Sequence, residues 1–215
     1  YAKEEGSQFI ANRLAQGVNI QFNSTIQSIE RNEKGWQING SGNFDAVIYC
    51  GDVRKLHEMV LQTNPEEKAA LQAVAQLRSN GTSNIFCETD ANDISWLYIP
   101  NPAIKAHRII YTGNFAESNN RGSQRKTCVV EFSGKVSYEE MCEQIKQLPG
   151  NLSPLDYNYE PNSYVVQETK TDSQIETIKK TFENKGLYLL GRFAEWEYYN
   201  MDKAIEAAMN LSKKI

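Results

Sequence analysis

Residues that bind soft metals are scarce in this sequence. It has two histidines, His57 and His107, which stand alone, and four cysteines that never form a Cys-x-x-Cys pair. A zinc site needs about four such ligands close together, so the composition argues against a metal centre. We expect all four cysteines to be reduced thiols of a cytoplasmic protein. They are Cys50, Cys87, Cys128 and Cys142.

An excess of positive charge is also missing. The 23 lysines and arginines are outnumbered by 27 aspartates and glutamates, and the formal net charge is -4. Nucleic-acid binding requires a basic surface, so DNA or RNA is not an expected partner. No apolar run is as long as a membrane-spanning helix, and residues 1–5 are too polar to open a signal peptide. These absences favour a globular protein that neither binds nucleic acid nor spans a membrane.

The sequence lacks the Gly-x-Gly-x-x-Gly fingerprint that cradles the pyrophosphate of a dinucleotide. Its nearest match, Gly40-Ser41-Gly42, lies between two expected strands and has no helix behind it. We therefore reject this glycine pair as a dinucleotide site. What the sequence does have is the composition of a packed globule, with 40% hydrophobic and 23% charged residues among 215. This length suits one large domain or two small ones.

Local patterns predict helices and strands that alternate along the chain. The apolar strand at 44–49 is typical of a buried parallel sheet, and the later strands are spaced like an antiparallel meander. The expected helices cover residues 6–16, 53–61, 65–77, 137–148, 173–184 and 203–214. The expected strands cover residues 18–20, 25–30, 35–38, 44–49, 82–88, 95–99, 107–112, 127–133, 164–166 and 186–190. The aromatic segment at 155–161 is expected to be a loop.

The most informative stretch lies near the end of the chain. A short apolar strand is followed by Gly-Arg-Phe-Ala-Glu-Trp-Glu-Tyr-Tyr-Asn-Met-Asp at residues 191–202, and then by a helix. Asp202 suits the N-cap of that helix. Such a turn directs the N–H groups of a helix start beyond the ends of the strands, where anionic ligands are favoured. The alternative is a plain connection between a strand and a helix.

The residue pattern of this stretch resembles a known sequence motif. Gly-Arg-Phe-x-x-Trp-x-Tyr-x-x-Met-Asp is similar to the C-terminal flavin-binding motif of UDP-galactopyranose mutases and of related amine oxidase and protoporphyrinogen oxidase-like flavoproteins. The opening of the chain resembles the middle of the same superfamily, although Glu5 stands where relatives often have a second glycine. The opening motif consists of Tyr1-Ala2-Lys3, Gly6-Ser7-Gln8, Val18 and Ile20, Thr25-Ile26 with Ile29, and Asp45-Ala46-Val47-Ile48.

The resemblance implies an α/β fold with an inserted domain. Residues 1–52 and 186–215 would form part of a Rossmann-like FAD-binding layer, and residues 53–185 would form a mainly antiparallel substrate domain with helices. Relatives carry the glycine fingerprint at their start. The chain is therefore expected to be the C-terminal portion of a longer flavoprotein, inactive and without FAD by itself.

The resemblance also implies which residues contact FAD. The arginine that matches Arg192 lies against the flavin in relatives, and the backbone that matches Ile26 contacts the adenine. The start of the last helix suits the dione edge or the ribityl chain of the flavin. Alternatives are a surface salt bridge for Arg192 and an ordinary buried strand position for Ile26. The full set of expected cofactor contacts is Ile26, Gly191, Arg192, Asn200, Met201 and Asp202.

Three residues resemble substrate contacts of the mutases. Arg108 lies in a segment similar to a strand whose arginine enters the active site, and alternation separates its face from that of Ile109. The tyrosine that matches Tyr198 binds the substrate diphosphate in mutases, and Tyr164 is similar to a tyrosine that precedes the last helix. Alternatives are a solvent-facing arginine and a core tyrosine. We assign no catalytic residue, and we expect Arg121 and Arg125 to lie in a solvated loop.

The function implied is that of an FAD-dependent oxidoreductase or mutase-like isomerase. Its small-molecule substrate would be a nucleotide sugar of polysaccharide or lipopolysaccharide biosynthesis. In those mutases the reduced flavin attacks the anomeric carbon of the sugar, UDP leaves, and the ring opens and recloses. One alternative is an amine oxidase-like dehydrogenase or oxidase. A second is a non-catalytic remnant that binds a glycan or a protein without flavin.

Overall fold

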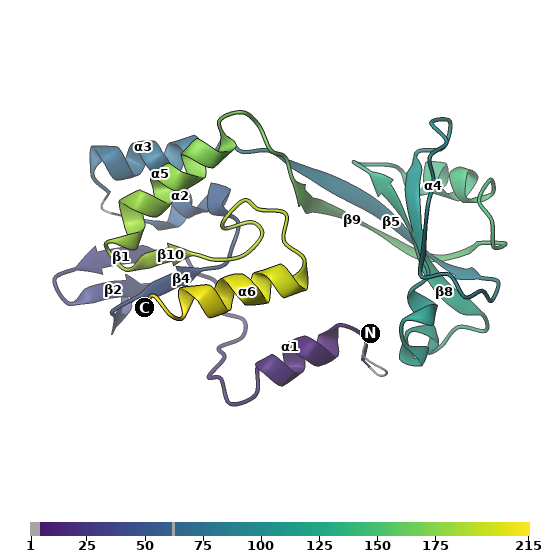
Figure 1. The fold of residues 1–215 in the computed structure, drawn as a ribbon, viewed down its shortest axis with the longest axis horizontal. Helices are drawn as coiled ribbons and strands as arrows, with labels where there is room; N and C mark the ends of the chain where they lie inside the picture. Colours follow the sequence, from purple (N-terminus) through teal and green to yellow (C-terminus); the bar gives the residue numbers. More distant parts are fainter. Residues whose placement is uncertain (1–4, 62) are drawn as a thin grey trace. The chain divides into compact units, whose positions relative to one another are not determined.

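The computed structural model describes residues 5–61 and 63–215. They form two compact units, and Figure 1 labels many of their helices and strands. The sheet unit comprises the described part of Tyr1–Phe22 together with Asn80–Ser163. The α/β unit comprises Asn23–Ser79 and Tyr164–Ile215. Tyr1-Ala2-Lys3 of the opening motif lies outside the described residues.

The α/β unit contains two small sheets and several helices. An antiparallel sheet is formed by β1 (Ile29–Asn32), β2 (Gly35–Ile38) and β3 (Ser41–Phe44). A parallel pair is formed by β4 (Val47–Tyr49) and β10 (Leu187–Leu189). The helices are η1 (Val53–Lys55), α2 (Leu56–Met59), α3 (Pro65–Val74), α5 (Thr171–Glu183) and α6 (Met201–Leu211).

The parallel pair joins two distant parts of the sequence. Leu187 pairs with Val47, and both side chains are buried in the core of the unit. Gly186, just before β10, has a φ of +84°, and a Cβ there would lie 2.6 Å from the carbonyl oxygen of Asp45. Only glycine fits this close approach. The prediction that residues 44–49 and 187–190 share one sheet is confirmed for Val47–Tyr49 and Leu187–Leu189, whereas Phe44 ends β3 of the antiparallel sheet.

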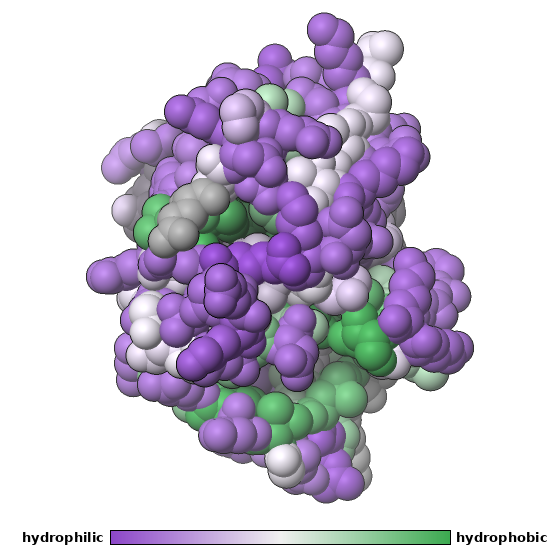
Figure 2. Space-filling view, turned by 90° about the vertical axis from the view of Figure 1, so that its left-hand side faces the viewer, coloured by the Kyte–Doolittle hydropathy of each residue, from purple (hydrophilic) through white to green (hydrophobic). Residues whose placement is uncertain are grey.

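Helices α3 and α5 complete the core of this unit. Their buried side chains include Val74, Ile178 and Phe182, and α3 starts with a reciprocal capping box between Asn64 and Glu67. By contrast, α6 buries none of its residues. Apolar groups reach the surface between polar ones on the side drawn in Figure 2. The described chain has no helix with both the length and the apolar character needed to cross a bilayer.

The sheet unit is built on one five-stranded sheet. Its strands lie in the order β6 (Trp96–Tyr98), β7 (Ala106–Ile110), β8 (Lys126–Ser133), β5 (Ser79–Thr89) and β9 (Ser153–Val165). The pairs β6–β7, β7–β8 and β5–β8 are antiparallel, as the strand spacing predicts. The helices are α1 (Gln8–Leu14), η2 (Thr112–Asn114), η3 (Glu117–Asn120) and α4 (Tyr138–Ile145).

The two faces of this sheet differ. On one face, Ile85 and Val130 are fully buried with Met141 and Ile145 of α4. Because successive side chains of a strand alternate, the other face carries residues such as Asn84 and Phe86, which are only partly buried. We call it the open face. It is the face that carries the polar candidates described below.

Several sequence predictions were wrong in detail. The expected loop at 155–161 is part of β9, because Leu155, Tyr157 and Tyr159 alternate with polar residues as they do in an exposed edge strand. The expected strand at 18–20 does not form, and the one at 25–30 begins only at Ile29. The apolar side chains of α1 remain exposed. The segment that contains α1 and residues 18–20 therefore lacks the buried contacts that would hold a strand in a sheet.

The compact units also divide the chain at other residues than expected. Residues 53–79 and 164–185, assigned to the inserted domain, lie in the α/β unit, because α3 and α5 pack in the same core as β4 and β10. Residues 5–22 belong to the sheet unit. The overall class is nevertheless the predicted one, a mixed α/β fold with an antiparallel sheet.

Candidate functional site

The terminal loop, residues 191–200, joins β10 to α6 and contains most of the candidates. It opens at Gly191, whose φ of +100° favours glycine. The Gly191 amide donates to Oε2 of Glu195 at 3.0 Å, and Lys179 pairs with Oε1 of the same carboxylate at 2.9 Å. The Val53 amide donates to the carbonyl oxygen of Phe193 at 3.0 Å. The first half of the loop is thus fixed to its own unit.

Trp196 anchors the middle of this loop. Its side chain is 1% exposed, its Nε1 donates to the carbonyl oxygen of Val166 at 3.2 Å, and its own carbonyl oxygen accepts from Gln167 at 2.6 Å. The Arg54 guanidinium lies 5.0 Å from the ring centroid. Trp196 has a φ of +54°, which is unusual for a bulky side chain and persists only where the surroundings impose it.

Three predicted site residues meet in a stack beside the loop. The Arg192 guanidinium lies 4.8 Å from the ring of Tyr198, and that ring stacks on Tyr164 at 5.7 Å with an interplanar angle of 14°. Arg192 Nε also donates to the carbonyl oxygen of Tyr199 at 2.8 Å. Tyr198 is 55% exposed, so the stack lies at the surface. The sequence motif therefore produces one coherent surface feature of the α/β unit.

The helix that follows starts earlier than predicted. Asn200 is the N-cap of α6, so Asp202 lies in the first turn, and its prediction as the N-cap was wrong. The side chain of Asn200 makes no capping hydrogen bond, unlike that of Asn64 in α3. A helix start without a side-chain cap suits a carbonyl or anionic group of a ligand. The contact of this helix start, with Met201, with the dione edge of a flavin stays a prediction.

Ile26 lies in a segment that another residue holds in place. Its side chain is 39% exposed and outside any strand, so the alternative of a buried strand residue is wrong. Asn39 accepts from the Gln27 amide at 2.7 Å and donates to the carbonyl oxygen of Thr25 at 2.9 Å. The backbone around Ile26 is thus braced, and its contact with adenine stays a prediction. The Asn39-Gly40 turn pair was the sequence signal for this brace.

Burial and charge keep one tyrosine of the loop protonated. Burial raises the pKa of Tyr199, and the nearby carboxylates of Glu195 and Glu197 raise it further. Ionisation of this phenol is thus moved further above neutral pH, where an ordinary tyrosine is already protonated. The described residues contain no group of three histidine, cysteine, aspartate or glutamate side chains suited to hold a metal ion.

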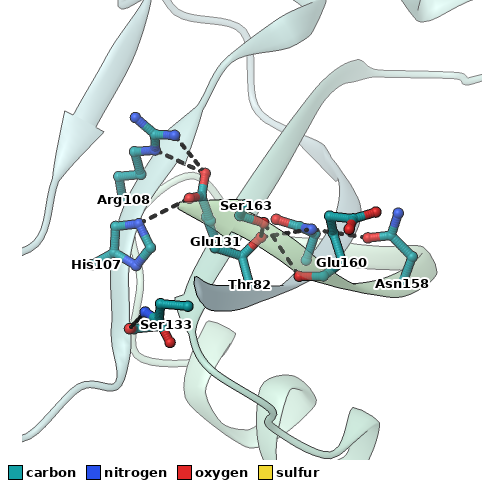
Figure 3. A network of polar contacts seen from close by, with 10 residues as sticks. Thr82, His107, Arg108, Glu131, Ser133, Asn158, Glu160 and Ser163 are labelled. Carbon is teal, nitrogen blue, oxygen red and sulfur yellow. Dashed lines mark hydrogen bonds and ion pairs between the residues drawn. The ribbon is translucent and has the colours of Figure 1, made fainter. Parts of the chain in front are cut away.

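Arg108 lies in the sheet unit, on the open face. Its Nε and Nη2 donate to Oε2 of Glu131 at 2.9 and 2.7 Å, and His107 Nε2 lies 3.1 Å from Oε1 (Figure 3). Glu131 is only 5% exposed, whereas Ile109 is fully buried on the opposite face, as the alternation predicts. The predicted common cleft of Arg108 with Arg192, Tyr198 and Asn200 joins residues of both units and stays a prediction.

Strand register extends this pair into a polar row. Arg108 lies opposite Tyr98 on β6 and opposite Glu131 on β8, and Glu131 lies opposite Asn84 on β5. Asn84 donates to Asn158 of β9 at 2.9 Å. Sequence reasoning missed Glu131, although a lone carboxylate in the apolar run Val-Val-Glu-Phe was a usable signal.

Comparisons with known proteins support the fold. No protein-family model matches the chain, and no curated protein sequence does. A crystal structure of reduced UDP-galactopyranose mutase matches 90% of this chain and 48% of its own, with a TM-score of 0.70 and 15% identity. A protein assigned as a protoporphyrinogen oxidase from Exiguobacterium sp. 255-15 matches 96% and 50%, with a TM-score of 0.69 and 10% identity.

A protein from Pyrococcus furiosus is similar over 78% of this chain and 40% of its own, with a TM-score of 0.53 and 13% identity. The chain thus spans about half the length of the first two solved structures that it matches. Identities this low show the fold alone. The fold is similar to that of about half of the UDP-galactopyranose mutase and of the protein assigned as a protoporphyrinogen oxidase.

Proposed function

We propose that this chain is the C-terminal part of an FAD-dependent enzyme that acts on a nucleotide sugar in polysaccharide or lipopolysaccharide biosynthesis. The terminal loop carries the proposal. It follows a parallel strand, leads to a helix start without a side-chain cap, and carries the Arg192–Tyr198–Tyr164 stack. It does so in a fold similar to that of flavin enzymes.

The flavin contacts would come from both ends of the α/β unit. Arg192 supplies a cation, and the first turn of α6 supplies N–H groups for the carbonyl edge of the ring. When bound, FAD supplies the redox-active ring, and the protein holds and orients it. The proposed contacts are Ile26, Gly191, Arg192, Asn200, Met201 and Asp202.

Further strands are needed to complete such a cofactor site. The parallel pair β4–β10 is open on both edges among the described strands, and parallel sheets are normally larger and covered on both faces. Met201, Ile205 and Met209 form a stripe on α6 and are 54%, 39% and 59% exposed. These features support a larger α/β layer, in which residues beyond these 215 supply the pyrophosphate-binding glycines.

The substrate contacts would come from Arg108, Tyr164 and Tyr198. An arginine suits a nucleotide-sugar diphosphate because its planar fork donates two hydrogen bonds at once. Glu131 holds the Arg108 guanidinium in one orientation, which supports a positioned rather than a mobile cation. The exposed ring of Tyr198 adds a hydroxyl donor.

The test uses the full-length enzyme and two variants. Arg108→Ala should weaken UDP-galactose binding by about 1.5–3 kcal/mol, the worth of a hydrogen bond to a charged group. Arg192→Ala should instead weaken retention of FAD. Titration of both variants with UDP-galactose, followed by flavin fluorescence, separates the two roles. Arg13→Ala, at an exposed arginine of α1, is the charge-matched control.

Loss of fold must be distinguished from loss of binding. Arg108→Ala removes a partner of the buried Glu131 carboxylate and should lower stability. The double variant Arg108→Ala/Glu131→Gln removes that charge, so it should regain stability without regaining UDP-galactose binding. Wild-type affinity in Arg108→Ala, or restored affinity in the double variant, would exclude the substrate role.

Amine oxidase-like chemistry is the second candidate. The protein assigned as a protoporphyrinogen oxidase matches this chain about as well as the mutase does, with TM-scores of 0.69 and 0.70. An oxidase consumes oxygen and releases hydrogen peroxide, whereas a mutase returns its flavin unchanged. Peroxide release by the full-length enzyme with an amine substrate, and no isomerisation of UDP-galactose, would favour the oxidase.

A further inference from the structure

A cavity of about 490 Å³ lies on the open face of the sheet unit. Phe86 of β5 and Val129 of β8 lie opposite each other in register and are partly buried there. Other lining residues are Thr127, Asn119, Arg121 and Asp156. We call this cavity the sheet pocket. Its volume is in the range of small-molecule sites, and it lies wholly within one compact unit.

Strand register places the sheet pocket beside the Arg108–Glu131 pair. Phe86, Val129 and Ile110 form one cross-strand row, and Asn84, Glu131 and Arg108 form the next. Two residues along a strand separate neighbouring rows, which is about 7 Å. The apolar floor of the pocket thus continues into the polar row that carries Arg108.

The wall of the sheet pocket is set by internal hydrogen bonds. Asn119 donates to the carbonyl oxygen of Thr112 at 2.9 Å, and Thr127 Oγ1 donates to the carbonyl oxygen of Asn119 at 3.0 Å. Asn120 also donates to the carbonyl oxygen of Gly113 at 2.9 Å. These bonds fix the loop that the sequence suggested was merely solvated. The pocket is therefore preformed.

Arg121 differs from the neighbouring cations of this loop in its ion pairing. Arg125 pairs with Asp90 at 2.6 Å, and Lys126 pairs with Glu117 at 2.8 Å. Within the part of the chain that the structure describes, Arg121 has no carboxylate within ion-pair distance. Its charge is therefore available to a ligand. Asp156 also lines the pocket; its Oδ1 accepts from the Tyr157 amide at 2.8 Å, and its other carboxylate oxygen can accept from a hydroxyl group.

We infer that the sheet pocket binds a phosphorylated monosaccharide. Phe86 offers an apolar ring face to the sugar, Asp156 accepts from sugar hydroxyls, and Arg121 donates to the phosphate through its planar fork. This site is separate from the residues assigned above to FAD and to the nucleotide-sugar diphosphate. The inference rests on the proposed function only for the choice of galactose as the sugar.

Titration of the 215-residue chain tests this site directly. Galactose 1-phosphate should bind, as followed by calorimetry and by NMR shifts of amides around the pocket. Arg121→Gln should weaken this binding at least tenfold, Arg121→Lys should retain part of it, and Phe86→Leu should weaken it about fivefold. Arg13→Gln is the control for charge. Tyr98→Leu, on the same face at the edge of the sheet, is the control for aromatic loss.

Two further probes fix the ligand class. Inorganic phosphate and UMP should bind more weakly than galactose 1-phosphate, because the first has no ring and the second lacks the hydroxyl pattern of a hexose. Equal affinity for inorganic phosphate, tighter binding of UMP, or an unaffected Arg121→Gln variant would overturn the inference. Asp156→Asn changes an exposed side chain and should leave the fold intact. It should still lower the affinity for galactose 1-phosphate, which separates loss of binding from any misfolding of the Phe86 variant.

The outcome is independent of the flavin proposal. Binding of galactose 1-phosphate by the chain without FAD, lost in Arg121→Gln, upholds the sheet pocket even if the full-length enzyme has no flavin. Conversely, a flavin-dependent enzyme whose 215-residue part ignores galactose 1-phosphate overturns the pocket alone.

Discussion

Single side chains hold the connections of the α/β unit together, and Tyr49 is one of them. Its hydroxyl donates to the carbonyl oxygen of Asp52 at 2.8 Å. The ring lies so close to the backbone that a Cβ at Gly51 would be 2.7 Å from its oxygen. Burial raises the pKa of Tyr49 to about 12, and the charges of Asp52 and Glu58 add to the effect. The fold therefore favours the protonated phenol.

Tyr49 predicts a loss of stability in strong base. A tyrosine of the unfolded chain ionises near pH 10, whereas folded Tyr49 ionises near pH 12. Its contribution is fully present below the unfolded pKa and is lost as pH rises through the folded pKa. In urea unfolding at several pH values, Tyr49→Phe should therefore lose less stability between pH 10 and 12 than the wild type does. Parallel pH curves for the two proteins would contradict this account.

At the scale of elements, two helix starts with the same residue behave differently. Asn64 caps α3 through its side chain, and Glu67 returns a bond of 2.7 Å to the Asn64 amide. Asn200 caps α6 with its backbone only. The asparagine side chains at these two equivalent N-cap positions therefore differ in their hydrogen bonds. One stabilises its helix, and the other makes no side-chain hydrogen bond to the first turn of α6.

This contrast gives a matched pair of variants. Asn64→Ala should cost about 0.5–2 kcal/mol of unfolding free energy, the usual worth of a side-chain cap. Asn200→Ala should leave the stability of the chain within about 0.5 kcal/mol of the wild type, as for an ordinary surface change. Chemical denaturation of both variants measures the difference. A large loss from Asn200→Ala would show that its side chain is structural rather than poised for a cofactor.

Sequence patterns predicted elements well where the signals are local. The strand, glycine and helix around Gly191 were found because each step follows from neighbouring residues. The edge strand β9 was missed because exposed tyrosines are typical of a loop, and their alternation with polar residues was not taken into account. The row through Arg108 and Glu131 was out of reach, since it depends on the register of strands far apart in sequence.

At the scale of the whole molecule, the parallel sheet of the α/β unit is small among the described residues. The described parallel sheet has two strands, and the stripe on α6 is exposed. The resemblance assigned the phosphate-binding glycines to residues that this chain does not contain. The sheet is consistent with this division, because both edges of the described pair lack a neighbouring strand and Ile48, opposite in direction to the buried Val47, is 42% exposed.

The absence of the glycine fingerprint from these 215 residues predicts whether the purified protein carries yellow flavin. The 215-residue chain should purify without flavin, because it lacks a glycine cradle for the pyrophosphate. Extension by an N-terminal Rossmann segment with Gly-x-Gly-x-x-Gly should restore stoichiometric FAD. Absorbance spectra of both preparations provide the test. A yellow 215-residue chain would mean that the cofactor site is divided differently.

The bond from Trp36 to Lys185 sets an order in which the molecule can assemble. Trp36 Nε1 donates to a carbonyl oxygen 149 residues away, and the indole is 2% exposed. During synthesis, the five-stranded sheet has emerged in full before β10 exists, so β4 and Trp36 must wait for a partner. Contacts of such long separation are slow to form, because the loop between them must be closed first. Residues 164–215 thus complete a core that residues 23–79 begin.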